Sequence, residues 1–236
     1  MLKPLVCFFL FLFLPFYFYS QTEKKNEFSI YNYKPTPQDR LILEVNHTGW
    51  LGMPDGLKEK LTSGGVNVFL FFDYPVKQTR FSFAWGLGFS SHNIHGPINL
   101  TQQVNTLTRG TQFLSISRRN EPYEVNRIGF KLLELPVEFR IRTKTNYQFK
   151  LMAGFKVGYV LLTFKKTFDA NGKIKTYDLF GVNPLRYGPT IRLGWEQVHL
   201  TAFYALSEAF IKNKGQAGII PFSIGIAYTP RIGIGR

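Results

Sequence analysis

The stretch that decides the fold is RFSFAWGLGF, residues 80–89. Every second residue from Phe81 to Phe89 is large and apolar, and the residues between them are small or polar, with Gly86 and Gly88 among them. Side chains of a β-strand alternate between its two faces, so one face is bulky and apolar and the other is nearly empty. A soluble sandwich usually presents Thr, Lys or Glu to water on its second face. We therefore expect the bulky face to contact lipid and the small face to line a narrow interior.

The same two-residue period recurs in seven other stretches. They are 40–51, 65–74, 127–143, 147–164, 185–195, 197–206 and 219–228. The opening stretch at 80–89 itself extends to about Ile94. Within 65–74 the alternation is poor, so its facing stays open. In 127–143 the phase slips at two adjacent leucines, which predicts a β-bulge near Leu132 or Leu133. On that interpretation Ile128, Phe130 and Leu132 contact lipid.

The connections between these stretches alternate strictly between long and short. The long ones are 52–64, 95–126, 165–184 and 207–218, and the short ones are 75–78, 144–146 and Glu196. Outer-membrane barrels have short periplasmic turns and longer extracellular loops. A soluble lipocalin-like barrel would turn its apolar face inward and leave the glycines exposed. The pattern predicts an all-β fold, a single antiparallel up-and-down transmembrane β-barrel of about eight strands, in the outer membrane of a Gram-negative bacterium.

The N-terminus reads as a targeting segment. An apolar run from Leu5 to Tyr19 is shorter than the roughly 20 residues of a membrane-spanning helix. We expect a signal peptide at 1–20, a periplasmic tail at 21–39 and the barrel at 40–236, with an uncleaved anchor as the alternative. The single cysteine, Cys7, lies in the apolar run, so the mature chain is expected to lack thiols and disulfides.

The chain is strongly basic, with a formal net charge of +14 that becomes +13 (14 − 1) once Lys3 is removed with the signal peptide. Such an excess favours anionic surroundings, such as lipid headgroups or phosphates, over neutral ones. The alternative is a solubility bias spread over the loops.

Charged residues also fall on the predicted inner face. They include Glu44, Arg80, Lys131, Arg140 and Arg142, together with a proposed network of Glu134, Glu138, Lys150, Lys156 and Arg192. A narrow interior tolerates charges only when they are paired, so the two glutamates are expected to pair with bases on neighbouring strands. Eight-stranded barrels are filled by their own side chains, which favours a polar plug over an anion-passing pore.

Motifs for catalysis, metals and cofactors are not evident. Ser91 and His92 are sequence neighbours on a strand and therefore point to opposite faces. The spacing of His92 and His95 lacks the helix and glutamate of a zinc site, and no phosphate-binding loop is present. We expect no enzyme activity, no cofactor and no nucleic-acid partner; an enzyme at the barrel rim, acting on lipid or protein, is the least favoured alternative.

The longest connection, 95–126, is rich in Thr, Gln and Asn and contains a short alternating run at 113–116. Loops of this length are usually functional or disordered. We expect an extracellular hairpin that continues the neighbouring strands. Its Arg109, Arg118 and Arg119 would form a basic rim for lipopolysaccharide headgroups or an acidic partner, because arginine pairs well with phosphate. The alternative is a solvated loop that binds nothing.

Four segments carry a family resemblance: GFKLLELPVEFRIRT (129–143), FKLMAGFKVGYVL (149–161), YGPTIRLGWE (187–196) and FSIGIAYTP (222–230). Over about residues 40–230 the chain resembles the PorT-like outer-membrane β-barrels of the Bacteroidota. The resemblance implies a part in type IX protein secretion. With a filled lumen and no catalytic motif, we expect a structural or interaction barrel, as a subunit of such a secretion complex or of an outer-membrane assembly complex, with other envelope proteins as partners. The alternative is a small porin or transporter. The ending PRIGIGR departs from the terminal aromatic residue of many such barrels.

Overall fold

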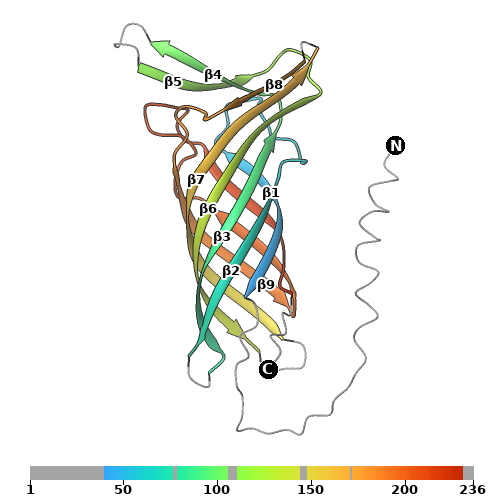
Figure 1. Cartoon of the computed structure of the whole chain (residues 1–236), viewed down its shortest axis with the longest axis vertical. Helices are drawn as coiled ribbons and strands as arrows, with labels where there is room; N and C mark the ends of the chain where they lie inside the picture. Colours follow the sequence, from blue (N-terminus) through green and yellow to red (C-terminus); the bar gives the residue numbers. More distant parts are fainter. Residues whose placement is uncertain (1–39, 77–78, 106–110, 144–147, 171, 231–236) are drawn as a thin grey trace, which may run out of the picture. The chain divides into compact units, whose positions relative to one another are not determined.

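The computed structural model describes residues 40–76, 79–105, 111–143, 148–170 and 172–230 (Figure 1). The predicted signal peptide at 1–20, the tail at 21–39 and the loop residue Arg109 lie outside the described residues. Within the described ranges, no helix has the length and hydropathy needed to cross a membrane.

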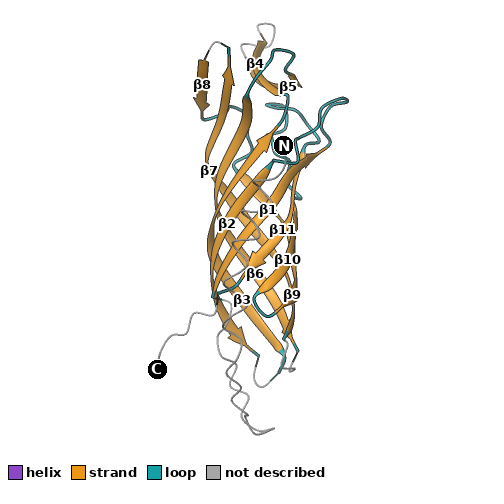
Figure 2. Ribbon diagram, turned by 90° about the vertical axis from the view of Figure 1, so that its right-hand side faces the viewer, coloured by secondary structure: helices purple, strands orange, loops and turns teal. Residues whose placement is uncertain are grey.

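Eight antiparallel strands form a closed ring, which confirms the predicted barrel (Figures 1 and 2). The strands are β1 (Leu41–Leu51), β2 (Gly64–Pro75), β3 (Phe81–His95), β6 (Val125–Arg142), β7 (Phe149–Asp169), β9 (Leu185–Trp195), β10 (Val198–Tyr204) and β11 (Ile220–Tyr228). Each strand pairs with the next in this order, and the ring closes where β11 pairs with β1. Closure pairs the backbone groups that lipid would otherwise leave without partners.

Three further strands lie at the end that carries the long connections (Figure 1). β4 (Ile98–Asn105) and β5 (Thr111–Arg118) form the hairpin expected in 95–126, but as a separate two-stranded sheet and not as a continuation of the barrel strands. β8 (Gly172–Tyr177) pairs with the end of β7 and was not predicted. The Asn-Gly dipeptide at 171–172 is a hairpin signal that would have indicated it.

The bulky faces of the barrel strands point outward. Trp85, Phe155, Ile191, Ile224 and Ile226 are 40–58% exposed, although all five are large and apolar. A contiguous surface of this kind would be unstable in water and is suited to the hydrocarbon core of a membrane. The outward orientation predicted for these strands is therefore confirmed.

The predicted facing of the first half of β6 is wrong. Ile128, Phe130 and Leu132 are buried inside the barrel, because every even-numbered residue of β6 faces inward from Asn126 to Arg142. The register shift does occur at Lys131 and Leu132, but the extra residue belongs to β7, where Leu161 has no partner. The interior turns apolar near the long-loop end, so both faces of β6 carry large apolar side chains there. Leu132 faces inward and Leu133 faces outward, which explains the two adjacent leucines.

The structure also settles the facing of β2. Phe69 and Phe71 point inward. A Cβ atom at Gly88 of β3 would clash with the Phe69 ring, and one at Gly86 would clash with the backbone carbonyl of Leu70 and touch the Phe71 ring. The glycines of the opening stretch are thus required by the close approach of β2, through the Phe69 ring at Gly88 and the Leu70 carbonyl at Gly86. The poor alternation of β2 comes from these inward aromatic residues.

Candidate functional site

The interior of the barrel has two layers. Charged side chains fill the half towards the short turns and the middle, and apolar side chains fill the end towards the long connections. We call the second layer the outer apolar cluster; it consists of Trp50, Leu57, Ile94, Ile98, Leu114, Ile116, Ile128, Phe130, Leu132, Ala209, Phe210 and Ile219. Alternation delivers both layers from the same strand faces, so β6 contributes Leu132 to one layer and Glu134 to the other.

Glu138 and Arg192 are at the centre of the charged layer. The carboxylate of Glu138 accepts hydrogen bonds from Arg192 and from Arg140, the latter at 3.0 Å. Arg192 also donates from Nε to Glu44 at 2.6 Å, and Asn67 donates to Glu44 at 2.7 Å. All five side chains are buried. Each charge therefore has a partner of opposite sign, which is the condition for burying ions.

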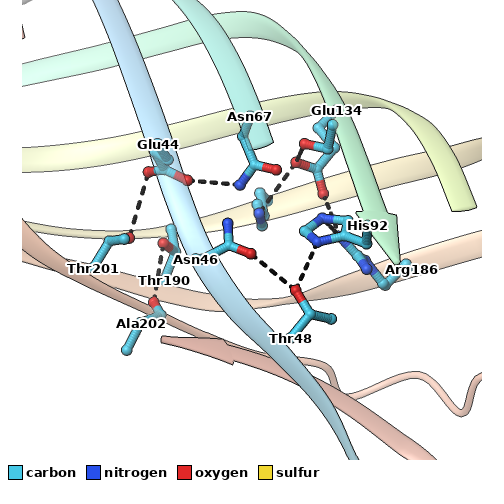
Figure 3. A network of polar contacts seen from close by, with 12 residues as sticks. Glu44, Asn46, Thr48, Asn67, His92, Glu134, Arg186, Thr190, Thr201 and Ala202 are labelled. Carbon is cyan, nitrogen blue, oxygen red and sulfur yellow. Dashed lines mark hydrogen bonds and ion pairs between the residues drawn. The ribbon is translucent and has the colours of Figure 1, made fainter. Parts of the chain in front are cut away.

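Glu134 holds the part of the network nearest the outer apolar cluster. It is fully buried and accepts from Lys156 and Arg186, both at 3.1 Å, and from the Ser90 hydroxyl. Its neighbour His92 is buried as well (Figure 3). The Glu134 carboxylate thus joins strands β3, β6, β7 and β9 across the lumen.

The contacts of His92 determine its tautomer. An arginine can only donate, so the 2.8 Å contact with Arg186 makes Nε2 of His92 the acceptor. Nδ1 then carries the proton and donates to Thr48 Oγ1 at 2.9 Å, and the Thr48 hydroxyl donates to Asn46 at 2.9 Å (Figure 3). The His92 ring therefore connects Arg186 of the charged layer with the neutral pair Thr48 and Asn46.

Aromatic rings support the buried bases. Arg140 lies 4.4 Å from the centroid of the Phe71 ring, and Lys156 lies 4.3 Å from that of Phe203. Cation–π contacts of this kind strengthen when water is excluded. Towards the short turns, Asp73 pairs with Arg142 and Arg140. The interior is therefore a continuous packed network.

The structure brings most of the predicted network together. Glu134 meets Lys156, Glu138 meets Arg192, and Lys150 lies on the inner face opposite Arg142 in the β6–β7 ladder. The predicted inward placement of two other bases is wrong. Arg80 is exposed before the start of β3, and Lys131 lies on the outer face of β6, since the facing of that strand does not change at the bulge.

Three ionisable members of the network were missed from the sequence: Asp73, His92 and Arg186. Arg186 had a usable signal, because it alternates with Gly188, Thr190 and Arg192 on the inner face of β9. Asp73 lies in β2, where the alternation is obscured by the inward phenylalanines, and His92 lies in β3 among small polar residues that give no sign of a partner.

The predicted basic rim does not form as expected among the described residues. Arg118 is exposed at the end of β5, whereas the Arg119 side chain is only 12% exposed and pairs with Asp169 and Glu121. Carboxylates already occupy Arg119, so it is poorly placed to bind an external phosphate.

The cavity at the junction of the two layers is small. A cavity of about 30 Å³ lies between the two layers, lined by Thr48, Trp50, His92, Phe130 and Arg186 among others. This volume is enough for one or two water molecules. Within the described ranges, no group of three or more His, Cys, Asp or Glu side chains is arranged to hold a metal ion.

Comparison with known proteins agrees with this architecture. The family model described as outer membrane protein beta-barrel domain matches residues 14–213, most of the chain. The comparison with curated protein sequences gave no match.

Proposed function

The chain belongs to the outer membrane protein beta-barrel domain family and lies in the outer membrane of a Gram-negative bacterium, and from this premise we propose that it acts as a closed structural or interaction barrel. It is neither a pore nor an enzyme in this proposal. In this proposal the protein functions through its outer surfaces, which contact lipid and bind other envelope proteins.

The observation that carries the proposal is the double filling of the lumen. Glu134, Glu138 and Arg192 are no more than 1% exposed, and the outer apolar cluster lies beyond them. Trp50 packs edge-to-face against Phe130 and Phe210, with ring centroids 5.8 and 5.7 Å apart. A hydrated ion would have to displace both layers to pass, and the buried charges lose their partners if they move.

The finer proposal is a subunit of a protein secretion complex of type IX, or of an outer-membrane assembly complex, as in the PorT-like barrels of the Bacteroidota. The sequence resemblance over 40–230 supports it. A further support is the hairpin β4–β5 and the strand β8, which present structured surfaces beyond the barrel ring. Ordered surfaces of this kind are suited to contact with partner proteins.

Planar-bilayer recording tests whether the barrel is closed. The purified protein is expected to give no steady single-channel steps, because both layers of the lumen are packed. A general porin prepared in the same detergent serves as the positive control. Reproducible steps of the purified barrel, with anion selectivity from the excess of interior bases, would establish the porin alternative instead.

Site-specific cross-linking in native membranes tests the interaction role. A photoreactive residue at Ser117, exposed on β5, is expected to capture discrete envelope proteins. The matched control is the same residue at Ile226, which faces lipid and is expected to capture lipid alone. If Ser117 yields no protein adduct in intact cells, the hairpin has no partner and this part of the proposal fails.

A further inference from the structure

Three cations form a row across the outer face of the strands beyond the barrel ring. In the β6–β7 ladder Arg127 is directly opposite Lys166, and in the β7–β8 ladder Lys166 is directly opposite Lys175. We call Arg127, Lys166 and Lys175 the cationic row. Lys131 lies on the same face of β6, four pairs from the row towards the barrel, and Lys173 lies on the same face of β8, two pairs from the row in the other direction.

The row is electrostatically unfavourable without an anion. Directly opposed residues on neighbouring strands have Cβ atoms about 4.5–5.5 Å apart, and like charges in such pairs are destabilising. The segments 125–131, 162–169 and 172–177 contain one carboxylate, Asp169. It alternates onto the opposite face together with Thr167 and pairs with Arg119. No carboxylate of these described segments therefore shares the face of the row.

An aromatic layer holds the row in place. The Phe164 ring lies across Gly129 of β6, where any Cβ atom would clash with it. The Arg127 guanidinium lies 5.7 Å from the centroid of this ring and Lys175 Nζ lies 4.9 Å from it. Lys175 also lies 4.5 Å from the Tyr177 ring. Two of the three cations are thus positioned by cation–π contacts, as a preformed site requires.

The charges also affect one another. Partial burial and, after it, the positive charges of Lys173, Arg127 and Lys175 lower the pKa of Lys166. A phosphate bound above the row would offset the repulsion between these cations, because a negative charge favours the charged form of each lysine.

Towards the membrane, the same outer face turns apolar. Leu133, Tyr159 and Leu161 are 41%, 53% and 52% exposed, and they lie on the membrane side of the Phe164 layer along β6 and β7. Along this path the surface presents hydrocarbon contacts, then aromatic rings, then cations. That order matches an amphiphile with acyl chains and phosphate groups.

We propose that the cationic row, with Lys131 and Lys173 beside it, binds the phosphate groups of lipopolysaccharide in the outer leaflet. Phosphate oxygens form charge-assisted hydrogen bonds with arginine and lysine, and basic residues near an anionic membrane surface are attracted to it. This proposal rests on the location in the outer membrane. It does not depend on whether the barrel conducts ions. Unlike Arg119, whose side chain pairs with Asp169 and Glu121, these cations have no carboxylate on their face within the described segments.

Binding of the full-length protein to lipopolysaccharide in nanodiscs tests the site. The double variant Lys166→Gln with Lys175→Gln is expected to weaken binding about 25-fold. Each cation near an anionic surface contributes a factor of about five, and two are removed. The matched control, Lys58→Gln with Lys212→Gln, removes the same charge from exposed positions outside the row and is expected to change binding by less than about fivefold in total. Equal weakening in both variants would overturn the site and leave a net-charge effect.

Two further arms identify the ligand. Lipopolysaccharide stripped of its phosphates is expected to bind the wild type as weakly as intact lipopolysaccharide binds the row variant. Inorganic phosphate is expected to compete poorly, since it lacks the acyl chains that contact Leu133 and Tyr159. Loss of the phosphate dependence, or competition by inorganic phosphate at the same concentration as lipopolysaccharide, would contradict the proposal.

Stability provides a readout that a purely structural row would not give. Without lipopolysaccharide, Lys166→Gln is expected to raise the thermal midpoint, because one cation of an opposed set is removed. With lipopolysaccharide the order should reverse, with the wild type gaining more stability from the ligand than the variant. The same rise in both conditions would mean that no anion occupies the row.

Discussion

Replacing Glu138 by Gln is expected to lower the free energy of unfolding by about 3–5 kcal/mol, the cost of breaking a buried ion pair from one side. Glu138 is 1% exposed and accepts hydrogen bonds from Arg140 and Arg192. The substitution leaves two guanidinium groups facing a neutral amide in the middle of the lumen. Denaturant unfolding in detergent micelles, followed by intrinsic fluorescence, measures the loss.

Two controls separate this effect from a general loss of charge. Glu121→Gln removes a carboxylate whose side chain is 77% exposed and paired with Arg119, and exposed pairs contribute at most about 1 kcal/mol. The double variant Glu138→Gln with Arg140→Gln removes both partners of one pair, while Asp73 keeps Arg142 and Glu44 keeps Arg192. Its loss should be smaller than the sum of the two single losses. An unchanged midpoint for Glu138→Gln would mean that water reaches this carboxylate.

Replacing Phe155 by Arg should destabilise the barrel by about 2–4 kcal/mol, the cost of an arginine on the lipid face near the bilayer midplane. Phe155 is 40% exposed near the middle of the part of β7 that pairs with β9, between Val137 and Pro189 in the neighbouring strands. Reversible unfolding from lipid vesicles measures the difference.

Leu61→Arg is the matched control, since Leu61 is 93% exposed in the connection between β1 and β2 and is expected to tolerate a charge. Cysteines placed at Ile224 and Ile226 give an independent test of the same face. They should react with lipid-soluble reagents and resist water-soluble ones. Fast reaction with the water-soluble reagent would mean that this surface is not in the membrane.

Local sequence patterns were sufficient for the architecture. The two-residue period of 80–89 and the alternation of long and short connections predict eight antiparallel strands and the lipid-facing side of most of them. These patterns work because alternation in a strand is purely local and because lipid requires a closed ring. They also place Glu134, Glu138 and Arg192 on the inner face, since each lies at an even position among outward apolar residues.

The tertiary structure decided everything that depends on which strands meet across the lumen or beyond it. The inward facing of Ile128 and Leu132 follows from the outer apolar cluster, which forms only when residues from distant strands converge. Partner choice is of the same kind: Arg186 reaches His92 and Glu134, which are 94 and 52 positions away in the chain. The cationic row depends on the register of β6, β7 and β8, and a shift of one residue would move its charges to the opposite face. Register is set by turns, bulges and packing together, so the sequence by itself determined the barrel and only the tertiary structure decided its contacts.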